Sequence, residues 1–237
     1  MRFLFLILSS HVAFAGSGAS ISVSHQIWNE LLMKYVDGNG VVNYKAMMNE
    51  KGKLESYLQL LDSNPPQDSW SRSEKIAYWI NAYNACTVKL ILDHYPVKSI
   101  RDIDNGKPWS DAFISIGGKN YSLDNIEQDI LRKQFNDPRI HFAINCASKS
   151  CPRLLNRSYT AAQLDEQLNA QAKDFLNDSS KNKITANNVQ LSSIFDWYKD
   201  DFTKKGTLID FLNLYSSKKI QPTATVTFLS YDWSLNE

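Results

Sequence analysis

Apolar residues recur at every third or fourth position over several stretches of the chain, which is the spacing of amphipathic helices. The stretch 74–94 is apolar around most of a helical wheel, so we expect this helix to lie in the middle of a domain. Asn81 and Asn84 share one side of it. Buried amides need hydrogen-bond partners, so we expect these two to brace loops or backbone across the core. The same spacing predicts further helices over 25–36, 47–61, 123–135, 161–176 and 208–215.

Shorter stretches alternate between apolar and polar residues, which predicts strands. Gly117-Gly118 separates two such stretches and predicts a hairpin turn, and Asn187-Asn188 does the same later in the chain. Helices dominate the first half and hairpins are scattered later, so the pattern predicts an α+β fold. The predicted strands cover 113–116, 119–123, 139–144, 184–186, 189–191 and 223–229.

The first fifteen residues have the pattern of a signal peptide. Arg2 supplies a positive charge, Phe3 to Leu8 an apolar run, and Ala13-Phe14-Ala15 a small-x-small cleavage site. The run is too short to cross a bilayer, so we expect no stable membrane anchor. The sequence therefore predicts a secreted or periplasmic protein, with a single domain over 16–237.

The charges nearly balance, with 26 Lys and Arg against 25 Asp and Glu. A nucleic-acid-binding protein would need a basic patch or stripe, so we expect no nucleic-acid partner. Nothing in the sequence indicates a cofactor. A small-molecule or peptide ligand fits the aromatic-rich composition, and the sequence leaves the oligomeric state open.

One stretch suggests chemistry. His141 lies on the predicted strand 139–144, and Cys146 and Cys151 follow in a loop of small, polar residues. An imidazole close to a thiol makes that thiol a usable nucleophile. Either cysteine is a candidate nucleophile. Asn145, Ser148 and the backbone N–H groups of the loop are candidates for stabilising an oxyanion.

Several blocks, taken together, resemble the family called domain of unknown function 547 (DUF547), from about Ser24 to the C-terminus. The blocks are Tyr78-Trp79-Ile80-Asn81-Ala82-Tyr83-Asn84-Ala85, His94-Tyr95-Pro96-Val97-Lys98-Ser99-Ile100, Ser122-Leu123-Asp124-Asn125-Ile126-Glu127, Pro138-Arg139-Ile140-His141-Phe142-Ala143-Ile144-Asn145-Cys146, Ser150-Cys151-Pro152 and Tyr231-Asp232-Trp233-Ser234-Leu235-Asn236.

The resemblance implies a papain-like or transglutaminase-like fold, in which a central buried helix packs against a small antiparallel sheet. It also implies a Glu–His–Cys site, which maps onto Glu127, His141 and a thiol of the loop. Glu127 would then fix the orientation of the imidazole. The order differs from papain-like enzymes, because here the thiols follow the histidine and Cys86 lies well inside the predicted helix. The expected function is a thiol-dependent hydrolase or acyl-transfer enzyme for peptide-like or thiol-containing small molecules.

Other interpretations stay open. A Cys146–Cys151 disulfide, with Cys86 as a reduced core residue, would make the chain a non-catalytic binding or scaffold module. Zinc bound by His141 and both loop cysteines, with Cys86, Glu127 or water as fourth ligand, matches no standard spacing. A dithiol oxidoreductase lacks the usual two-residue spacing. Aromatic residues offer a ligand groove lined by Trp109, Trp197 and Tyr198.

Overall fold

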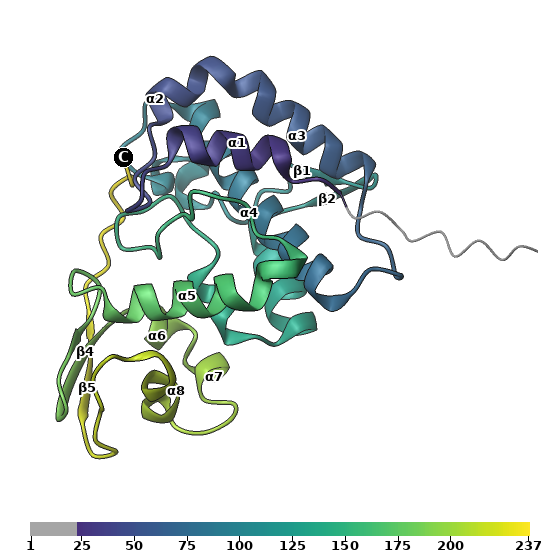
Figure 1. Ribbon diagram of the computed structural model, residues 1–237. Helices are drawn as coiled ribbons and strands as arrows, with labels where there is room; N and C mark the ends of the chain where they lie inside the picture. The colour runs from purple at the N-terminus through teal and green to yellow at the C-terminus, as the bar shows by residue number, and fades with distance from the viewer. Residues whose placement is uncertain (1–22) are drawn as a thin grey trace, which may run out of the picture.

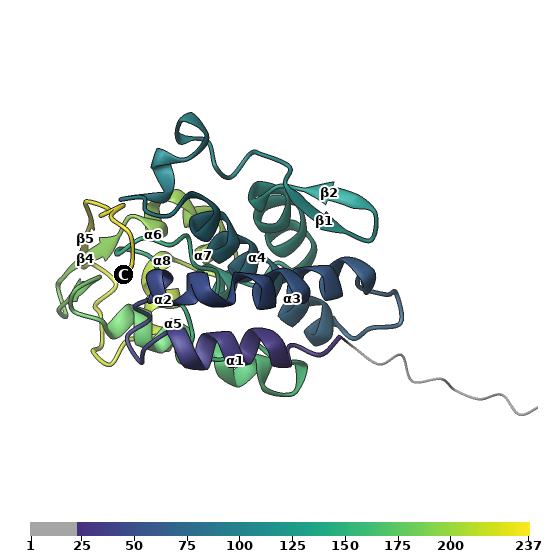
Figure 2. The ribbon, with the colours of Figure 1, turned by 90° about the horizontal axis from the view of Figure 1, so that it is seen from above.

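Helices form most of the computed structural model, which describes residues 23–237, and short strands lie at two opposite ends (Figure 1 and Figure 2). The predicted signal peptide lies outside the described residues. None of the described helices has the length and apolarity needed to span a membrane. The α-helices are α1 (Gln26–Tyr35), α2 (Tyr44–Met47), α3 (Lys51–Ser63), α4 (Arg72–His94), α5 (Leu164–Asn177), α6 (Ile194–Trp197), α7 (Lys199–Phe202) and α8 (Leu208–Tyr215).

Helix α4 is the buried centre of the fold, as the sequence predicts (Figure 2). It begins at a capping box, in which the Ser71 hydroxyl accepts from the Glu74 amide and the Glu74 carboxylate accepts from the Ser71 amide. From Ile76 to Leu92 nearly every side chain is buried. Helix α3 lies alongside it, α1 packs against α3, and the larger set of buried side chains surrounds α4.

The other predicted helices are confirmed over 25–36, 161–176 and 208–215, with ends within a few residues. The stretch 47–61 is interrupted, because a 3₁₀ turn, η1 (Met48–Glu50), separates α2 from α3. The stretch 123–135 winds more widely, as the π-helix η4 (Asn125–Phe135). Its side chains Ile126, Ile130 and Leu131 are buried as predicted. Short 3₁₀ turns also occur at η2 (Ile100–Asp102), η3 (Asp104–Gly106) and η6 (Ala161–Gln163).

Both predicted hairpins form. Strands β1 (Ile114–Ile116) and β2 (Lys119–Tyr121) are antiparallel, and the turn uses Gly117 and Gly118, both with positive φ. Strands β3 (Lys183–Ile184) and β4 (Asn188–Ser192) are antiparallel as well.

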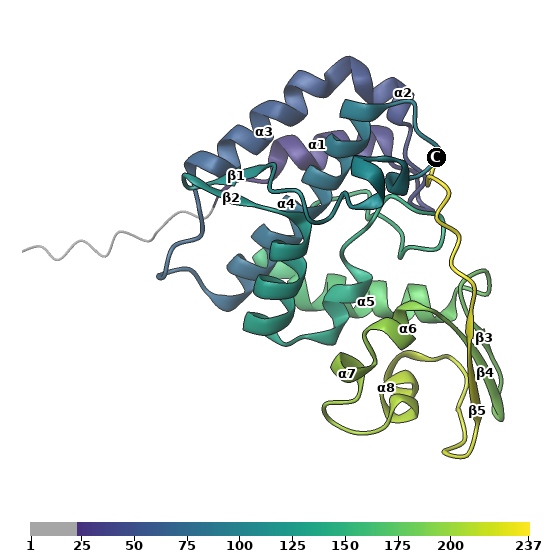
Figure 3. The ribbon, with the colours of Figure 1, turned by 180° about the vertical axis from the view of Figure 1, so that it is seen from behind.

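The last strand corrects the expectation of a purely antiparallel sheet. Strand β5 (Thr225–Leu229) runs parallel to β4, with Val189 opposite Val226. This three-stranded sheet lies at the end of the molecule next to α6 and α8, away from α4 (Figure 3). The fold is therefore a mixture of helices and small sheets, in which the central helix packs among helices.

The predicted strand over 139–144 is wrong. Residues Pro138–Phe142 form a 3₁₀ helix, η5, whose first turn is capped by the Asp137 carboxylate accepting from the Arg139 amide. Ile140 to Ile144 are all buried, so the chain has protein on both sides here. Ile140 and Phe142 are both apolar because each packs in a different part of the core. They do not share the buried face of a strand.

The buried residues fall into two clusters that meet at η5. Ile140 belongs to the cluster around α4, whereas Phe142 packs against Phe175, Phe202 and Phe211 in the cluster beneath the three-stranded sheet. Helix α5 contributes to both clusters. The segment that follows η5 therefore lies where the two clusters join, and this segment carries the loop cysteines.

Candidate functional site

A pocket of about 390 Å³ opens where the two clusters join. It brings together all four predicted catalytic residues, Glu127, His141, Cys146 and Cys151. Its walls come from α4, η4, η5, α6 and the loops and C-terminal segment around them, and the aromatic residues proposed for a ligand groove are among them. The pocket is lined by Tyr83, Lys107, Trp109, Ser110, Asp124, Glu127, His141, Ile144, Cys146, Cys151, Pro152, Ile194, Trp197, Tyr198, Tyr231 and Trp233.

The two buried amides of α4 hold the segments around the pocket. Asn84 donates to the Ala143 carbonyl at 2.9 Å and accepts from the Asn145 amide at 2.8 Å. These two hydrogen bonds fix the backbone just before Cys146. Asn81 makes the same pair of bonds to the backbone of Tyr159, at 2.8 and 2.9 Å. Both residues are thus bracing groups, and the structure places neither in the wall of the pocket.

The C-terminal segment closes over the cysteine loop from the other side. The Lys149 amide donates to the Ser234 carbonyl at 2.8 Å, and the Ser150 amide donates to the Asp232 carbonyl at 3.1 Å. Ala147, between these contacts and Cys146, has a φ of +57°. A left-handed alanine costs energy unless its surroundings impose it, and here both sides of the loop are tied down.

Cys146 has its sulfur atom within hydrogen-bond distance of three groups. Its Sγ is 3.0 Å from Cys151 Sγ, 3.1 Å from Ser148 Oγ and 3.3 Å from the Tyr231 hydroxyl oxygen. Hydrogen bonds from these groups, that from Cys151 first, stabilise the thiolate and outweigh burial. They lower the pKa of Cys146 from 9.0 to about 7. Burial raises the pKa of Tyr231, so its hydroxyl keeps the proton that it donates.

The three cysteines are free thiols and differ sharply in character. Cys151 is buried, and burial together with the hydrogen bond to Cys146 raises its pKa well above 9.0. Cys86 is buried in α4, where burial raises its pKa to about 12. The disulfide alternative is therefore not the state seen here, because the Cys146 and Cys151 sulfurs are in contact without a bond.

His141 is held by a carboxylate that the sequence did not single out. Its Nε2 is 2.8 Å from Asp201 Oδ2, and its ring stacks on Tyr198 with centroids 4.0 Å apart. Arg132 Nε, at 2.6 Å, and Lys204 Nζ, at 3.0 Å, also bind Asp201. Although burial is the largest single influence and raises the pKa of Asp201, the bonds from His141, Arg132 and Lys204 together hold it well below 3.8.

This geometry fixes which ring nitrogen is available. With Nε2–H donating to Asp201, Nδ1 is left for the pocket that His141 lines. Within residues 23–237 no hydrogen bond joins His141 to either loop sulfur. The expected direct contact between imidazole and thiol is thus absent, and both groups instead face one shared cavity.

The predicted hydrogen bond between Glu127 and His141 is wrong. Glu127 is buried, and its carboxylate accepts from the Tyr198 hydroxyl at 2.6 Å and from the Tyr83 hydroxyl at 3.2 Å. Tyr198 contacts both residues, because its ring stacks on His141 and its hydroxyl donates to Glu127. The contact between Glu127 and His141 is therefore indirect and runs through Tyr198.

The predicted oxyanion donors have other partners. The Cys146 amide donates to Cys151 Sγ at 3.0 Å, and the Ala147 amide donates to Asn145 Oδ1 at 2.8 Å. Asn145 Nδ2 donates to the Pro152 carbonyl at 2.7 Å. Ser148 points at Cys146 and Tyr231. The hydroxyl of Tyr231 lies beside the sulfur, and Tyr231 also lines the pocket.

The zinc interpretation is not supported by side-chain positions. Among the residues that the structure describes, no group of three or more His, Cys, Asp and Glu side chains is arranged to hold a metal ion. His141 binds Asp201, and Cys86 lies within α4.

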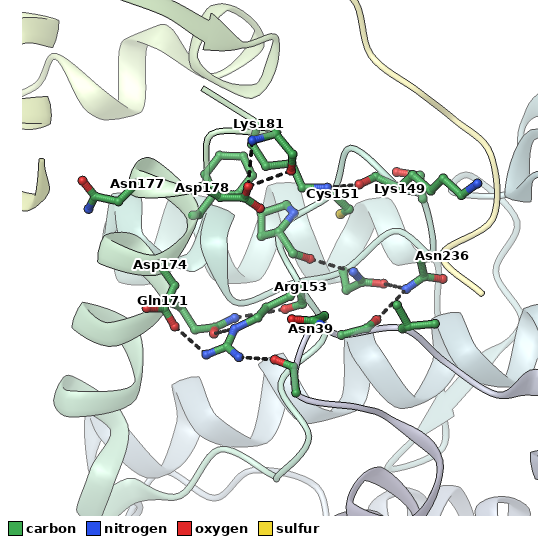
Figure 4. Close-up of a pocket in the computed structure, with 18 of the residues that line it drawn as sticks. Asn39, Lys149, Cys151, Arg153, Gln171, Asp174, Asn177, Asp178, Lys181 and Asn236 are labelled. Carbon is green, nitrogen blue, oxygen red and sulfur yellow. Dashed lines mark hydrogen bonds and ion pairs between the residues drawn. The ribbon is translucent and has the colours of Figure 1, made fainter. Parts of the chain in front are cut away.

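A larger groove of about 1200 Å³ lies on the other side of Cys151 (Figure 4). Its charged side chains mostly bind neighbouring protein groups. Arg153 binds the Gly38 carbonyl, Gln171 and Asp174, and Lys181 binds the Lys149 carbonyl. The groove is thus a self-paired polar surface, and the smaller pocket holds the reactive groups.

Two residues of the site were missed by sequence reasoning, Asp201 and Tyr231. Asp201 is 60 positions after His141, in a stretch for which the sequence pattern predicts no helix or strand, and its neighbour Asp200 is exposed. Tyr231 stands in a block that carried the family resemblance, which was the one available signal.

Comparison with known proteins adds a family but no activity. Residues 67–176 match the family model described as "Protein of unknown function, DUF547". Neither the curated proteins nor the solved structures give a match, so the likeness to papain-like and transglutaminase-like folds stays a prediction. The matched residues include α4, η4, His141 and both loop cysteines, whereas Asp201 and Tyr231 follow them. Over residues 67–176 the chain is therefore similar to the DUF547 family, in line with the resemblance that its sequence blocks carry.

Proposed function

We propose that this protein is an exported thiol-dependent hydrolase or acyl-transfer enzyme, with Cys146 as nucleophile and His141 as general acid and base. The observation that carries the proposal is the shared pocket. A thiol whose pKa is lowered to about 7 and an imidazole fixed by a buried carboxylate line the same 390 Å³ cavity.

The roles differ from those in a simple thiol–imidazole pair. The thiolate forms through donors beside it, Cys151, Ser148 and Tyr231, so it does not depend on His141 to remove its proton. His141 is then free to act on the substrate across the cavity. Asp201 keeps the ring in one orientation.

The reaction follows from these positions. The Cys146 thiolate attacks the carbonyl carbon, and the bond to the leaving group breaks as the imidazolium of His141 protonates that group. In hydrolysis, His141 then takes a proton from water as the water attacks the thioester. The carbon–sulfur bond breaks and the thiolate is restored. The Tyr231 hydroxyl, next to the sulfur, is placed to donate to the carbonyl oxygen as it gains charge.

The walls of the pocket indicate the substrate class. Trp109, Trp197 and Trp233 line it together with Ile144 and Ile194, so most of the wall is aromatic or aliphatic. Its few charged groups include Lys107 and Glu127. A peptide-like or thioester substrate with an apolar acyl group fits such a site.

The test is acylation of the full chain by small aryl esters and thioesters with apolar acyl groups, followed by intact-mass measurement. We expect one acyl group on Cys146 in the wild type and in the matched control Cys86→Ser. Cys146→Ser should lose the adduct. His141→Gln should slow turnover of the adduct at least tenfold, since general acid–base catalysis contributes about 10²–10⁴-fold.

The proposal fails if folded wild-type protein acquires no adduct across the panel. It also fails if Cys146→Ser is acylated at the wild-type rate. Circular dichroism of each variant separates loss of chemistry from loss of fold.

A further inference from the structure

Cys151 forms no covalent bond in the acyl-transfer steps, yet it is positioned against the nucleophile. Its sulfur is 3.0 Å from Cys146 Sγ, and it also accepts from the Cys146 amide at 3.0 Å. The two thiols lie five positions apart on one loop whose ends are both fixed, by Asn84 before Cys146 and by Asn145, which binds the Pro152 carbonyl. The loop therefore presents one accessible sulfur with a buried sulfur directly behind it.

We propose that Cys146 and Cys151 form a redox-active pair that exchanges with small, low-molecular-weight disulfides, Cys146 as the attacking thiol and Cys151 as the resolving thiol. This activity uses the nucleophile of the proposed hydrolase but does not require that acyl transfer occurs.

The exchange balances in two steps. The Cys146 thiolate attacks one sulfur of the substrate disulfide, forms a mixed disulfide and releases the first substrate thiolate. Cys151 then attacks the Cys146 sulfur, the mixed disulfide breaks, and the second substrate group leaves as a thiol carrying the Cys151 proton. The protein dithiol is oxidised to a disulfide and the substrate disulfide is reduced to two thiols.

The surroundings favour this order of attack. Cys146 lines the pocket and is only partly buried, whereas Cys151 is 6 % exposed. The hydrogen bond to Cys146 and its charge contribute to the raised pKa of Cys151. Once Cys146 is in a mixed disulfide, that charge is gone, and Cys151 gives up its proton more readily. Closing the disulfide requires the sulfurs to approach by only about 1 Å.

Spacing alone argued against a dithiol site, since the two residues are five apart and no helix begins at Cys146. The structure supplies other donors instead, because Ser148 and Tyr231 contact the Cys146 sulfur. These hydroxyl groups stabilise the thiolate of Cys146, as a helix N-terminus stabilises the thiolate in Cys-x-x-Cys motifs.

The experiment uses the reduced full chain and glutathione disulfide as the probe. Samples are quenched in acid with a maleimide, and free thiols are counted by intact mass. We expect the wild type to fall from three free thiols to one, and peptide mapping to find the disulfide between Cys146 and Cys151. Dithiothreitol should restore all three thiols. At pH 7 Cys146 should react about fivefold faster than a thiol with a pKa of about 9, because more of it is ionised. This figure allows for the weaker nucleophilicity of a thiolate with a lower pKa.

Variants separate the two roles. Cys151→Ser should accumulate a stable glutathione adduct on Cys146, and Cys146→Ser should form none on Cys151. Cys86→Ser is the matched control and should behave like the wild type apart from one fewer thiol.

Three results would overturn the proposal: Cys151→Ser without an adduct, a persistent unresolved adduct on the wild type, or a disulfide that dithiothreitol cannot reduce in the folded protein. The wild-type thiol count decides the matter even if a variant does not fold. A negative result in this experiment does not contradict acylation of Cys146, and a negative acylation result does not contradict this exchange. The two proposals are therefore tested independently.

Discussion

Asp201 determines how the imidazole of the site is held. It accepts from His141 and from Arg132 through the same oxygen, Oδ2, and its other oxygen binds Lys204. A single carboxylate that serves an imidazole and two cations is well placed to keep its charge. Asp201 therefore both stabilises the fold and orients the imidazole of His141. Its contribution to the free energy of unfolding can be measured through its dependence on pH.

Replacing Asp201 with Asn should destabilise the protein by about 2 kcal/mol at neutral pH, because hydrogen bonds to a charged group are lost in a mostly buried place. The pKa of Asp201 is lowered on folding, so this stabilisation is full above its ordinary value of 3.8 and is lost as the pH falls below it. The difference in unfolding free energy between wild type and Asp201→Asn should thus shrink in acid.

Urea titrations between pH 7 and pH 3 measure this difference. The exposed neighbour provides the control, since Asp200→Asn changes the same charge on the same helix, α7, and should cost less than about 0.5 kcal/mol. A gap that stays constant down to pH 3 would show that the Asp201 charge is not what stabilises the fold.

At the scale of elements, helix α4 acts as the support of the site. The periodicity predicted this helix well, because its capping box and its apolar surface are both local features. The same reasoning failed for η5, where Ile140, Phe142 and Ile144 alternate as in a strand. Pro138 and the Asp137 cap start a 3₁₀ turn there, and burial on both sides depends on contacts that are remote in sequence.

The two bracing amides of α4 give a matched pair of variants. Asn81→Ala and Asn84→Ala each leave one buried amide and one buried carbonyl without partners, so each should cost about 2–4 kcal/mol. Asn84 holds the chain beside Cys146, whereas Asn81 holds Tyr159. Only Asn84→Ala should raise the pKa of Cys146.

Thermal unfolding gives the stability, and alkylation rates across pH give the thiol pKa. The pKa of Cys146 could instead shift equally in Asn81→Ala and Asn84→Ala. That result would mean that overall destabilisation of the fold, and not the hydrogen bonds from Asn84 to the loop, controls the thiol pKa.

At the scale of the whole molecule, the pocket is a meeting point of remote segments. Tyr83 comes from α4, His141 from η5, Tyr198 from the turn between α6 and α7, and Tyr231 from the C-terminal segment. Sequence reasoning found His141 and the cysteines because they share one short stretch. It could not find Asp201 as the partner of His141, or place Glu127 behind Tyr198, because only the packing of the two clusters brings these residues together.

That assembly explains the reactivity of the thiol. The C-terminal segment crosses the cysteine loop and brings the Tyr231 hydroxyl within 3.3 Å of Cys146 Sγ, so a group 85 positions away helps to set the pKa of the nucleophile. An isolated loop with the same residues would lack this donor.

The most direct test is the rate of alkylation of Cys146 by iodoacetamide from pH 5 to pH 10, followed by peptide mapping. The structure predicts a rate that rises with a midpoint near pH 7, with Cys86 unlabelled in the folded protein. In Tyr231→Phe the midpoint should move upward, because one donor to the thiolate is lost. A wild-type midpoint near pH 9 would contradict the activated thiol on which the proposed function depends.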